Sequence, residues 1–162
     1  MSAQIKYGYS TQIGFAGGIV DLAPHVIDTF LNEENDGAML LGAGVVKGTE
    51  AGKIKLPQTG ATAATFEGIT TNNHTTEYDL TGKTFVRKGA AVGVMKYGRI
   101  YARVADGVEV AYGDPLYLIV TGDEAGCFTK TAGSNVAVKG RFLGAKDAVA
   151  GVAPVELYNQ AQ

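Results

Sequence analysis

Turn residues divide most of this chain into short pieces, and this punctuation limits what the chain can fold into. Glycine accounts for 23 of the 162 residues, about twice its usual share. From Ala38 onward, Gly, Asp, Asn and Pro recur between apolar runs of only a few residues. Such spacing is typical of short strands, and no segment has helical periodicity over the length of an ordinary helix. We therefore predict an all-β domain over residues 37–162, a short-stranded β-barrel or sandwich.

The clearest predicted strand runs from Val92 to Val104, where apolar and polar side chains alternate. Alternation with a period of two indicates a strand with one buried face. Gly98 interrupts this pattern and predicts a bend or bulge near Tyr97-Gly98. The face that we expect to be buried contains Val92, Val94, Ile100, Ala102 and Val104.

Shorter strands are predicted on both sides of this one. Asp106-Gly107 is a strong signal for a two-residue hairpin, after which Val108, Val110 and Tyr112 resume an apolar face. The other runs read as strands are Ala38–Val46, Ile54–Leu56, Phe66–Thr71, Thr84–Arg87 and Leu116–Val120.

The first part of the chain is apolar without a steady period, and we predict an extended N-terminal arm over residues 1–36. Its glycines and Pro24 interrupt any strand or helix pattern, so another surface must cover its large side chains. We expect the β-domain to fold without residues 2–31, and Asn32–Gly37 to be the solvated exit of the arm. The open alternative is that the arm folds back on its own domain as an extra edge strand. The arm residues predicted to form a protein interface are Tyr7, Tyr9, Ile13, Phe15, Ile19 and Phe30.

A second candidate interface lies on the outward face of the Val92–Val104 strand. Tyr and Arg are enriched at the energetic centres of protein interfaces, but aromatic and basic stripes also stack on sugars or single-stranded bases. The net charge of −2 argues against a nucleic-acid partner. A protein partner is therefore favoured, with a carbohydrate- or ligand-binding β-module as the alternative. The residues of this stripe are Tyr97, Arg99, Tyr101 and Arg103.

No set of residues assembles into a recognisable catalytic, cofactor or metal site, so we expect neither an enzyme nor a cofactor. Gly82-Lys83-Thr84 lacks the earlier glycine of a phosphate-binding loop. A calcium-like run from Asn32 lacks the acidic residue that such a loop needs at its end. Neither His25 nor His74 has a nucleophile context, and Cys127 is a single cysteine. Without a visible secretion signal or membrane-spanning stretch, we expect synthesis in a cytoplasm and no membrane partner.

Several segments, taken in order, resemble the cement, or decoration, proteins of tailed-bacteriophage capsids. The similarity extends over nearly the whole chain, and the order and spacing of the segments carry it. The similar segments are Met1–Tyr9, Gly17-Gly18, Asp21-Leu22, Phe66–Ile69, Val92–Ile100, Ala111–Tyr117, Arg141–Gly144 and Ala153–Tyr158.

This resemblance implies a structural protein of the virion without catalytic residues. It implies a β-rich fold that binds the outer surface of a phage head and clamps neighbouring subunits of the major capsid protein. It also implies self-association, as a homotrimer at a threefold position of the shell.

Overall fold

The computed structural model describes residues 13–72, 76–78, 80–82 and 84–158, and it confirms an all-β fold. Its strands are joined by turns and by one short 3-10 helix, η1. In chain order the elements are β1 (Val26–Asn32), β2 (Gly44–Lys47), β3 (Lys53–Lys55), η1 (Ala63–Thr65), β4 (Phe66–Thr70), β5 (Glu77–Tyr78), β6 (Thr84–Phe85), β7 (Ala91–Arg103), β8 (Pro115–Leu118), β9 (Phe128–Thr129), β10 (Val136–Phe142) and β11 (Val152–Leu157).

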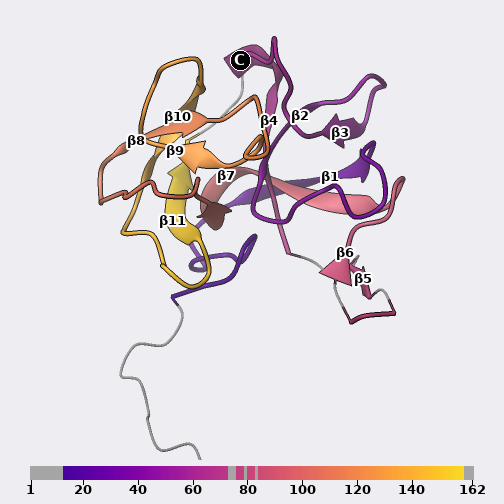
Figure 1. Ribbon diagram of the computed structural model, residues 1–162, viewed down its shortest axis with the longest axis horizontal. Coiled ribbons are helices and arrows are strands. Elements are labelled where there is room, and N and C mark those ends of the chain that lie inside the picture. Colours follow the sequence, from indigo (N-terminus) through magenta and orange to yellow (C-terminus); the bar gives the residue numbers. More distant parts are fainter. Residues whose placement is uncertain (1–12, 73–75, 79, 83, 159–162) are drawn as a thin grey trace, which may run out of the picture.

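Five strands close into a barrel in the order β1-β3-β2-β4-β7, and β1 completes the ring by pairing antiparallel with β7 (Figure 1). Only the β1–β3 pair is parallel. The barrel interior contains one apolar cluster, whose fully buried members include Val45, Ile54, Val92 and Val94. The sequence left a barrel and a sandwich as alternatives, and the structure is a closed barrel with additional strands.

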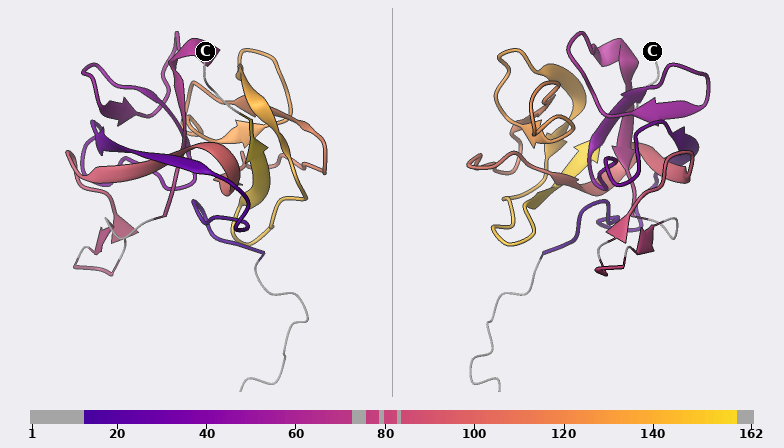
Figure 2. Two further views of the ribbon diagram at one scale, coloured as in Figure 1. Left: turned by 180° about the vertical axis from the view of Figure 1, so that it is seen from behind. Right: turned by 45° about the vertical axis from the view of Figure 1, so that its right-hand side comes forward.

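The additional strands form a second antiparallel sheet that begins on the C-terminal half of β7. Its order is β7-β11-β10-β8-β9. An isolated bridge joins Phe128 of β9 to Val104, just beyond the end of β7. The second sheet therefore curls back toward the strand from which it starts, and β7 connects it to the barrel (Figure 2).

A bulge marks the point where β7 leaves the barrel. Ile27 of β1 pairs with Met95, whereas the preceding residue, Val26, pairs with Tyr97, so β7 has one extra residue here. Gly98 has a φ of 125°, and a Cβ at this position would lie 2.6 Å from the Cβ of His25. The bend predicted at Tyr97-Gly98 is thus confirmed, and glycine is required because His25 crosses directly over the strand.

Besides the cluster inside the barrel, a second apolar cluster lies between the barrel and the second sheet, and we call it the shared core. Phe66 and Met95, from β4 and β7, belong to the same buried cluster as Leu118 and Phe142 of the second sheet. The rings of Phe66 and Phe128 meet edge to face with their centroids 6.5 Å apart. Burial of these side chains therefore stabilises both parts together.

Part of the predicted arm belongs to the fold. Residues 17–20 run antiparallel to residues 99–101 of β7, and β1 continues in the same direction beside residues 91–97. Residues 26–32, predicted to lie in the arm, are thus a barrel strand, as the fold-back alternative anticipates. Asn32, predicted at a solvated exit, is only 1% exposed and bonds through its side chain to the backbone of Glu34 and Arg87.

The hairpin predicted at Asp106-Gly107 does not form, although these residues do make a turn. Both edges of β7 are already occupied at this point, by β11 on one side and by Gly18 and Gly42 on the other. Val110 therefore enters the shared core without becoming a strand residue.

Candidate protein-interface surface

The structure places the predicted Tyr and Arg stripe on one outward face of β7, and the chain's own N-terminal segment covers much of it. Val92, Val94, Ile100 and Ala102 are fully buried, as predicted. They do not enter one cluster, because Val92 and Val94 lie in the barrel interior, and Ile100 and Ala102 in the shared core. Residues 13–25 cross the outward face and engage two of the four stripe residues in turn, Tyr101 and then Arg99.

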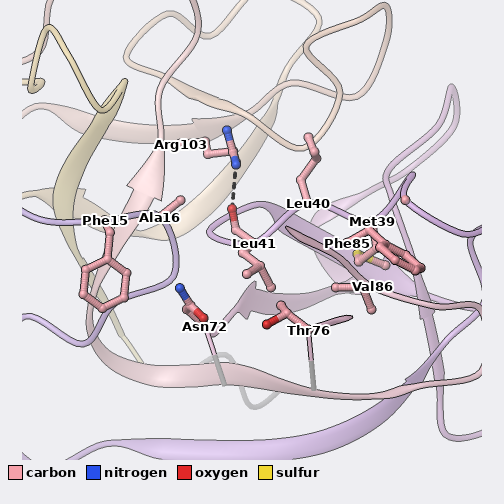
Figure 3. Close-up of a pocket in the computed structure, with 11 residues that line it drawn as sticks. Phe15, Ala16, Met39, Leu40, Leu41, Asn72, Thr76, Phe85, Val86 and Arg103 are labelled. Carbon is pink, nitrogen blue, oxygen red and sulfur yellow. Dashed lines mark hydrogen bonds between the residues drawn. The ribbon is translucent and has the colours of Figure 1, made fainter. Parts of the chain in front are cut away.

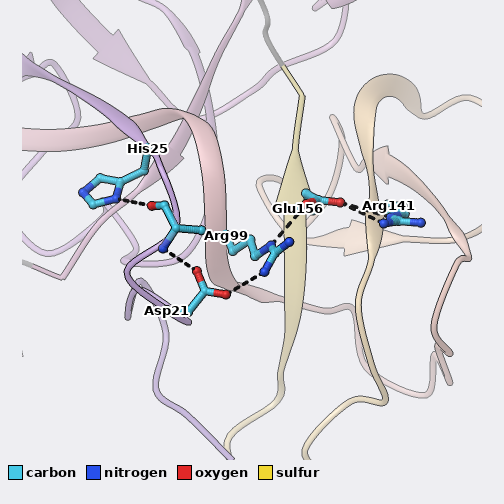
Figure 4. A network of polar contacts seen from close by, with 6 residues as sticks. Asp21, His25, Arg99, Arg141 and Glu156 are labelled. Atoms are coloured by element: carbon cyan, nitrogen blue, oxygen red, sulfur yellow. Dashed lines mark hydrogen bonds and ion pairs between the residues drawn. The ribbon is translucent and has the colours of Figure 1, made fainter.

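Arg99 lies at the centre of an ion-pair network that joins the N-terminal segment to β7, β11 and β10 (Figure 4). Its Nη1 donates to Asp21 Oδ2 at 2.7 Å, and its Nε donates to Glu156 Oε1 at 3.1 Å. Arg141 donates to the other oxygen of Glu156 at 3.1 Å. Hydrogen bonds from Arg99 and from the Ala23 amide lower the pKa of Asp21, and the two carboxylates raise the pKa of Arg99. Arg99 therefore fastens the N-terminal segment to β7 and β11.

Tyr101 and Arg103 also make contacts within the chain. A Cβ on Gly14 would lie 2.6 Å from the Tyr101 ring, so glycine at position 14 lets the backbone pass over that ring. The backbone of Tyr101 exchanges hydrogen bonds with Gly17 and Gly18, and Arg103 Nε donates to the Leu41 carbonyl at 2.7 Å. The carbohydrate-binding alternative needs an open stripe, and the open part of this one is at Tyr97 and Arg99, whose exposed fractions are 41% and, for the side chain of Arg99, 39%.

Tyr97 remains the most open residue of the stripe, with 41% of its surface exposed. It lines a small hollow of about 140 Å³ together with Pro24, Leu157 and Tyr158. The open part of the predicted stripe is thus its end nearest the bulge.

Three predicted arm residues lie on the surface although their backbone is held in place. Ile13, Phe15 and Ile19 are 56%, 55% and 43% exposed. Ile19 forms a bridge with Ile100, and the Phe15 carbonyl accepts a hydrogen bond from Gly18. We call these three side chains the N-terminal apolar surface.

A buried carboxylate anchors the start of the N-terminal segment. Asp147, in the turn before β11, accepts hydrogen bonds from the amides of Ile13, Val149 and Ala150 at 2.8–2.9 Å. These bonds lower the pKa of Asp147. No motif in the sequence identifies this role, because the contact joins residues 134 positions apart.

Phe15 also lines a cleft of about 310 Å³ beside the barrel (Figure 3). Met39, Leu41 and Phe85 contribute apolar walls, and Asn72 and Arg103 contribute polar groups. The cleft extends the N-terminal apolar surface toward the β5–β6 hairpin, where Tyr78 is 73% exposed.

Phe30, Tyr7 and Tyr9, the other predicted arm residues, do not belong to the N-terminal apolar surface. Phe30 packs against the barrel core, and Lys96 Nζ lies 5.1 Å from the centre of its ring. Tyr7 and Tyr9 lie outside the described residues. The exposed side chains of Val26, Ile27 and Leu31 on β1 were not predicted, because their strand was read as part of an unpatterned arm.

Within residues 13–158, apart from the short undescribed gaps, no three His, Cys, Asp or Glu side chains are grouped so that they could hold a metal ion. Over the same residues, no helix has the length and apolar character needed to cross a membrane.

Comparison with known proteins identifies a family and a fold. Residues 3–158 match the family model described as "Structural cement protein (E217 gp24/Pam3 gp6)". A chain from the solved structure "The capsid of Myoviridae Phage XM1" superposes with a TM-score of 0.73 at 24% identity, over 99% of this chain and 100% of that one. No curated protein matches the sequence.

Proposed function

Because this chain belongs to the phage structural cement protein family and has a structural role in the capsid, we propose that it binds the outer surface of the phage head and clamps neighbouring major capsid subunits. The virion is then its place of action, after synthesis in the host cytoplasm. It acts as a homotrimer and needs no cofactor.

The N-terminal apolar surface carries this proposal. Side chains such as Ile13 and Phe15, with about half of their surface exposed, add less to the domain's own stability than full burial would, and neighbouring exposed apolar side chains often mark an interaction site. Their backbone is nevertheless fixed, by Asp147 at one end and by β7 along its length. Fixing a binding segment beforehand lowers the entropy cost of association, so the arrangement suits docking onto another protein.

Symmetry explains how modest contacts can hold a shell together. Each capsid presents the same contact many times, and linked copies bind with far higher avidity than single ones. Tyr7 and Tyr9 are proposed to add contacts beyond the described domain, to capsid subunits or to sister copies.

Adding the purified protein to capsids that lack it tests this function. We expect saturable binding at a fixed number of copies per shell, and disruption of decorated shells at a higher temperature than bare ones, because binding to the intact form stabilises it. Heated shells can be followed by light scattering or by release of packaged DNA. Bound protein that leaves the disruption temperature unchanged would reject the clamp, and absence of binding would reject capsid attachment itself.

A further inference from the structure

Strand β1 has one open edge. The amide of Asn32 donates to Ala90 on the β7 side, whereas the amides of Leu31 and Glu33 donate to Gly52 and Ile54 on the β3 side. Since backbone groups alternate along a strand, Ile27 and Thr29 also face the β3 side. β3 pairs only with Leu31 and Asn32, and nothing else in the described chain pairs with Ile27 or Thr29 on that edge.

The open edge is also apolar. Val26, Ile27 and Leu31 are 50%, 36% and 44% exposed, and Asp28 is the only charged residue among residues 26–31. Native proteins protect exposed edges with lysine, proline, bulges or a covering segment, because a bare apolar edge invites pairing with another chain. On this edge only a covering segment remains as protection.

The chain contains a segment whose sequence suits this place. Ile5, Tyr7 and Tyr9 recur with a period of two and alternate with polar or small residues, as in a strand with one apolar face. Lys6 falls on the opposite face, where it can approach the half-exposed carboxylate of Asp28. We propose that residues 4–10 of a second copy add to the open edge of β1 as an extra strand.

The path of the N-terminal segment points to a second copy and away from the same one. Read backward from Val26, the chain moves along β7 from Tyr97 toward Tyr101 and ends at Ile13 on Asp147. At Ile13 the chain, read backward, is therefore heading away from β1. Tyr7 lies six residues before Ile13, so an extended chain carries it roughly 20 Å from that anchor, which suffices to reach a directly adjacent copy.

The inference rests on the proposed self-association of this protein, and it names the open edge of β1 as the place where sister copies meet. A strand that each copy donates to the next one makes a heterologous contact, which closes into a ring when the rotation allows. Backbone hydrogen bonds would supply affinity. With Tyr7 opposite Thr29, the side chains of Ile5 and Tyr9 would lie over Ile27 and Leu31 and supply register.

Crosslinking between two cysteine variants tests the pairing in the absence of capsids. Both populations carry Cys127→Ser, one also carries Tyr7→Cys, and the other, with a size tag, also carries Thr29→Cys. After mixing and treatment with a short bismaleimide, we expect mixed dimers at about ten times the yield of a control with Ser134→Cys, because pairing raises the local thiol concentration. Ser134 is a suitable control because it is exposed and lies in a loop of the second sheet.

Two outcomes would overturn the inference. One is a mixed-dimer yield equal to that of the Ser134→Cys control. The other concerns a chain that carries both Tyr7→Cys and Thr29→Cys. If it crosslinks only within single chains at every protein concentration, residues 4–10 pair with the β1 edge of their own copy. Capsid binding of the uncrosslinked variants is measured separately, so loss of the crosslink with capsid binding intact rejects this inference alone.

Discussion

Removal of residues 2–31 is expected to unfold the protein, whereas removal of residues 2–12 is expected to leave it folded. The longer deletion takes away nearly all of β1, which closes the barrel and pairs with six residues of β7. It also removes Asp21 from Arg99 and exposes the apolar interior beside Phe30. A domain is stable by only about 5–15 kcal/mol, so loss of a closing strand exceeds what the remaining contacts can supply.

Circular dichroism and thermal unfolding of the two truncated proteins measure this difference. The protein without residues 2–12 should melt within about 3 °C of the full chain, because every described contact remains. The protein without residues 2–31 should show no cooperative transition at room temperature or above. A folded, cooperative protein after the longer deletion would restore the boundary first predicted at residue 36 and would contradict the role assigned to β1.

Substitution of Phe128 by alanine is expected to lower the free energy of unfolding by about 3–5 kcal/mol. Phe128 is fully buried, packs edge to face on Phe66 of the barrel, and forms the bridge that returns the second sheet to the end of β7. The loss corresponds to a fall in melting temperature of roughly 10–15 °C for a domain of this size. Val149→Ala, at a position that is 90% exposed, serves as the control and should change stability by less than about 0.5 kcal/mol.

The same variant tests whether the molecule folds as one unit. Because the barrel and the second sheet share a core, Phe128→Ala should still unfold in a single transition when followed by fluorescence and by circular dichroism. Two separate transitions, with the barrel melting at its original temperature, would show that the sheets are stabilised independently.

The sequence predicts the fold class and its central strand well, because both depend on local signals. The alternation of Ile100 and Ala102 with polar neighbours identifies the buried face of the second half of β7, and Gly98 indicates the bulge. In the first half both faces are buried, because Val92 and Val94 enter the barrel while Met95 enters the shared core. The hairpin at Asp106-Gly107 fails for a non-local reason, since other segments already occupy both edges of β7. A turn signal does not reveal whether the strand beside it is free to pair.

The candidate surface is less predictable from sequence, because some of its residues contact other segments of the same chain. Arg99 and Tyr101 were predicted to face a partner. Within the chain, Arg99 binds Asp21 and the ring of Tyr101 lies under Gly14. A pattern shows which side chains face outward, but it does not show which part of the same chain covers them. Residues 17–32 likewise appear irregular in sequence, since the loop at residues 21–25 separates two segments that both follow β7.

Co-sedimentation with capsids that lack this protein tests the central claim most directly, by comparing the full chain with the variant Ile13→Ser/Phe15→Ser/Ile19→Ser. These side chains are half-exposed, so the variant should fold, and Tyr112→Ser, at a site that is 67% exposed in the turn before β8, is the control. The account predicts that the triple variant binds at least about tenfold more weakly than the full chain and the control, because truncation of interface anchors commonly costs more than 1 kcal/mol each. Equal binding by all three proteins would contradict the claim that the N-terminal apolar surface docks on the capsid.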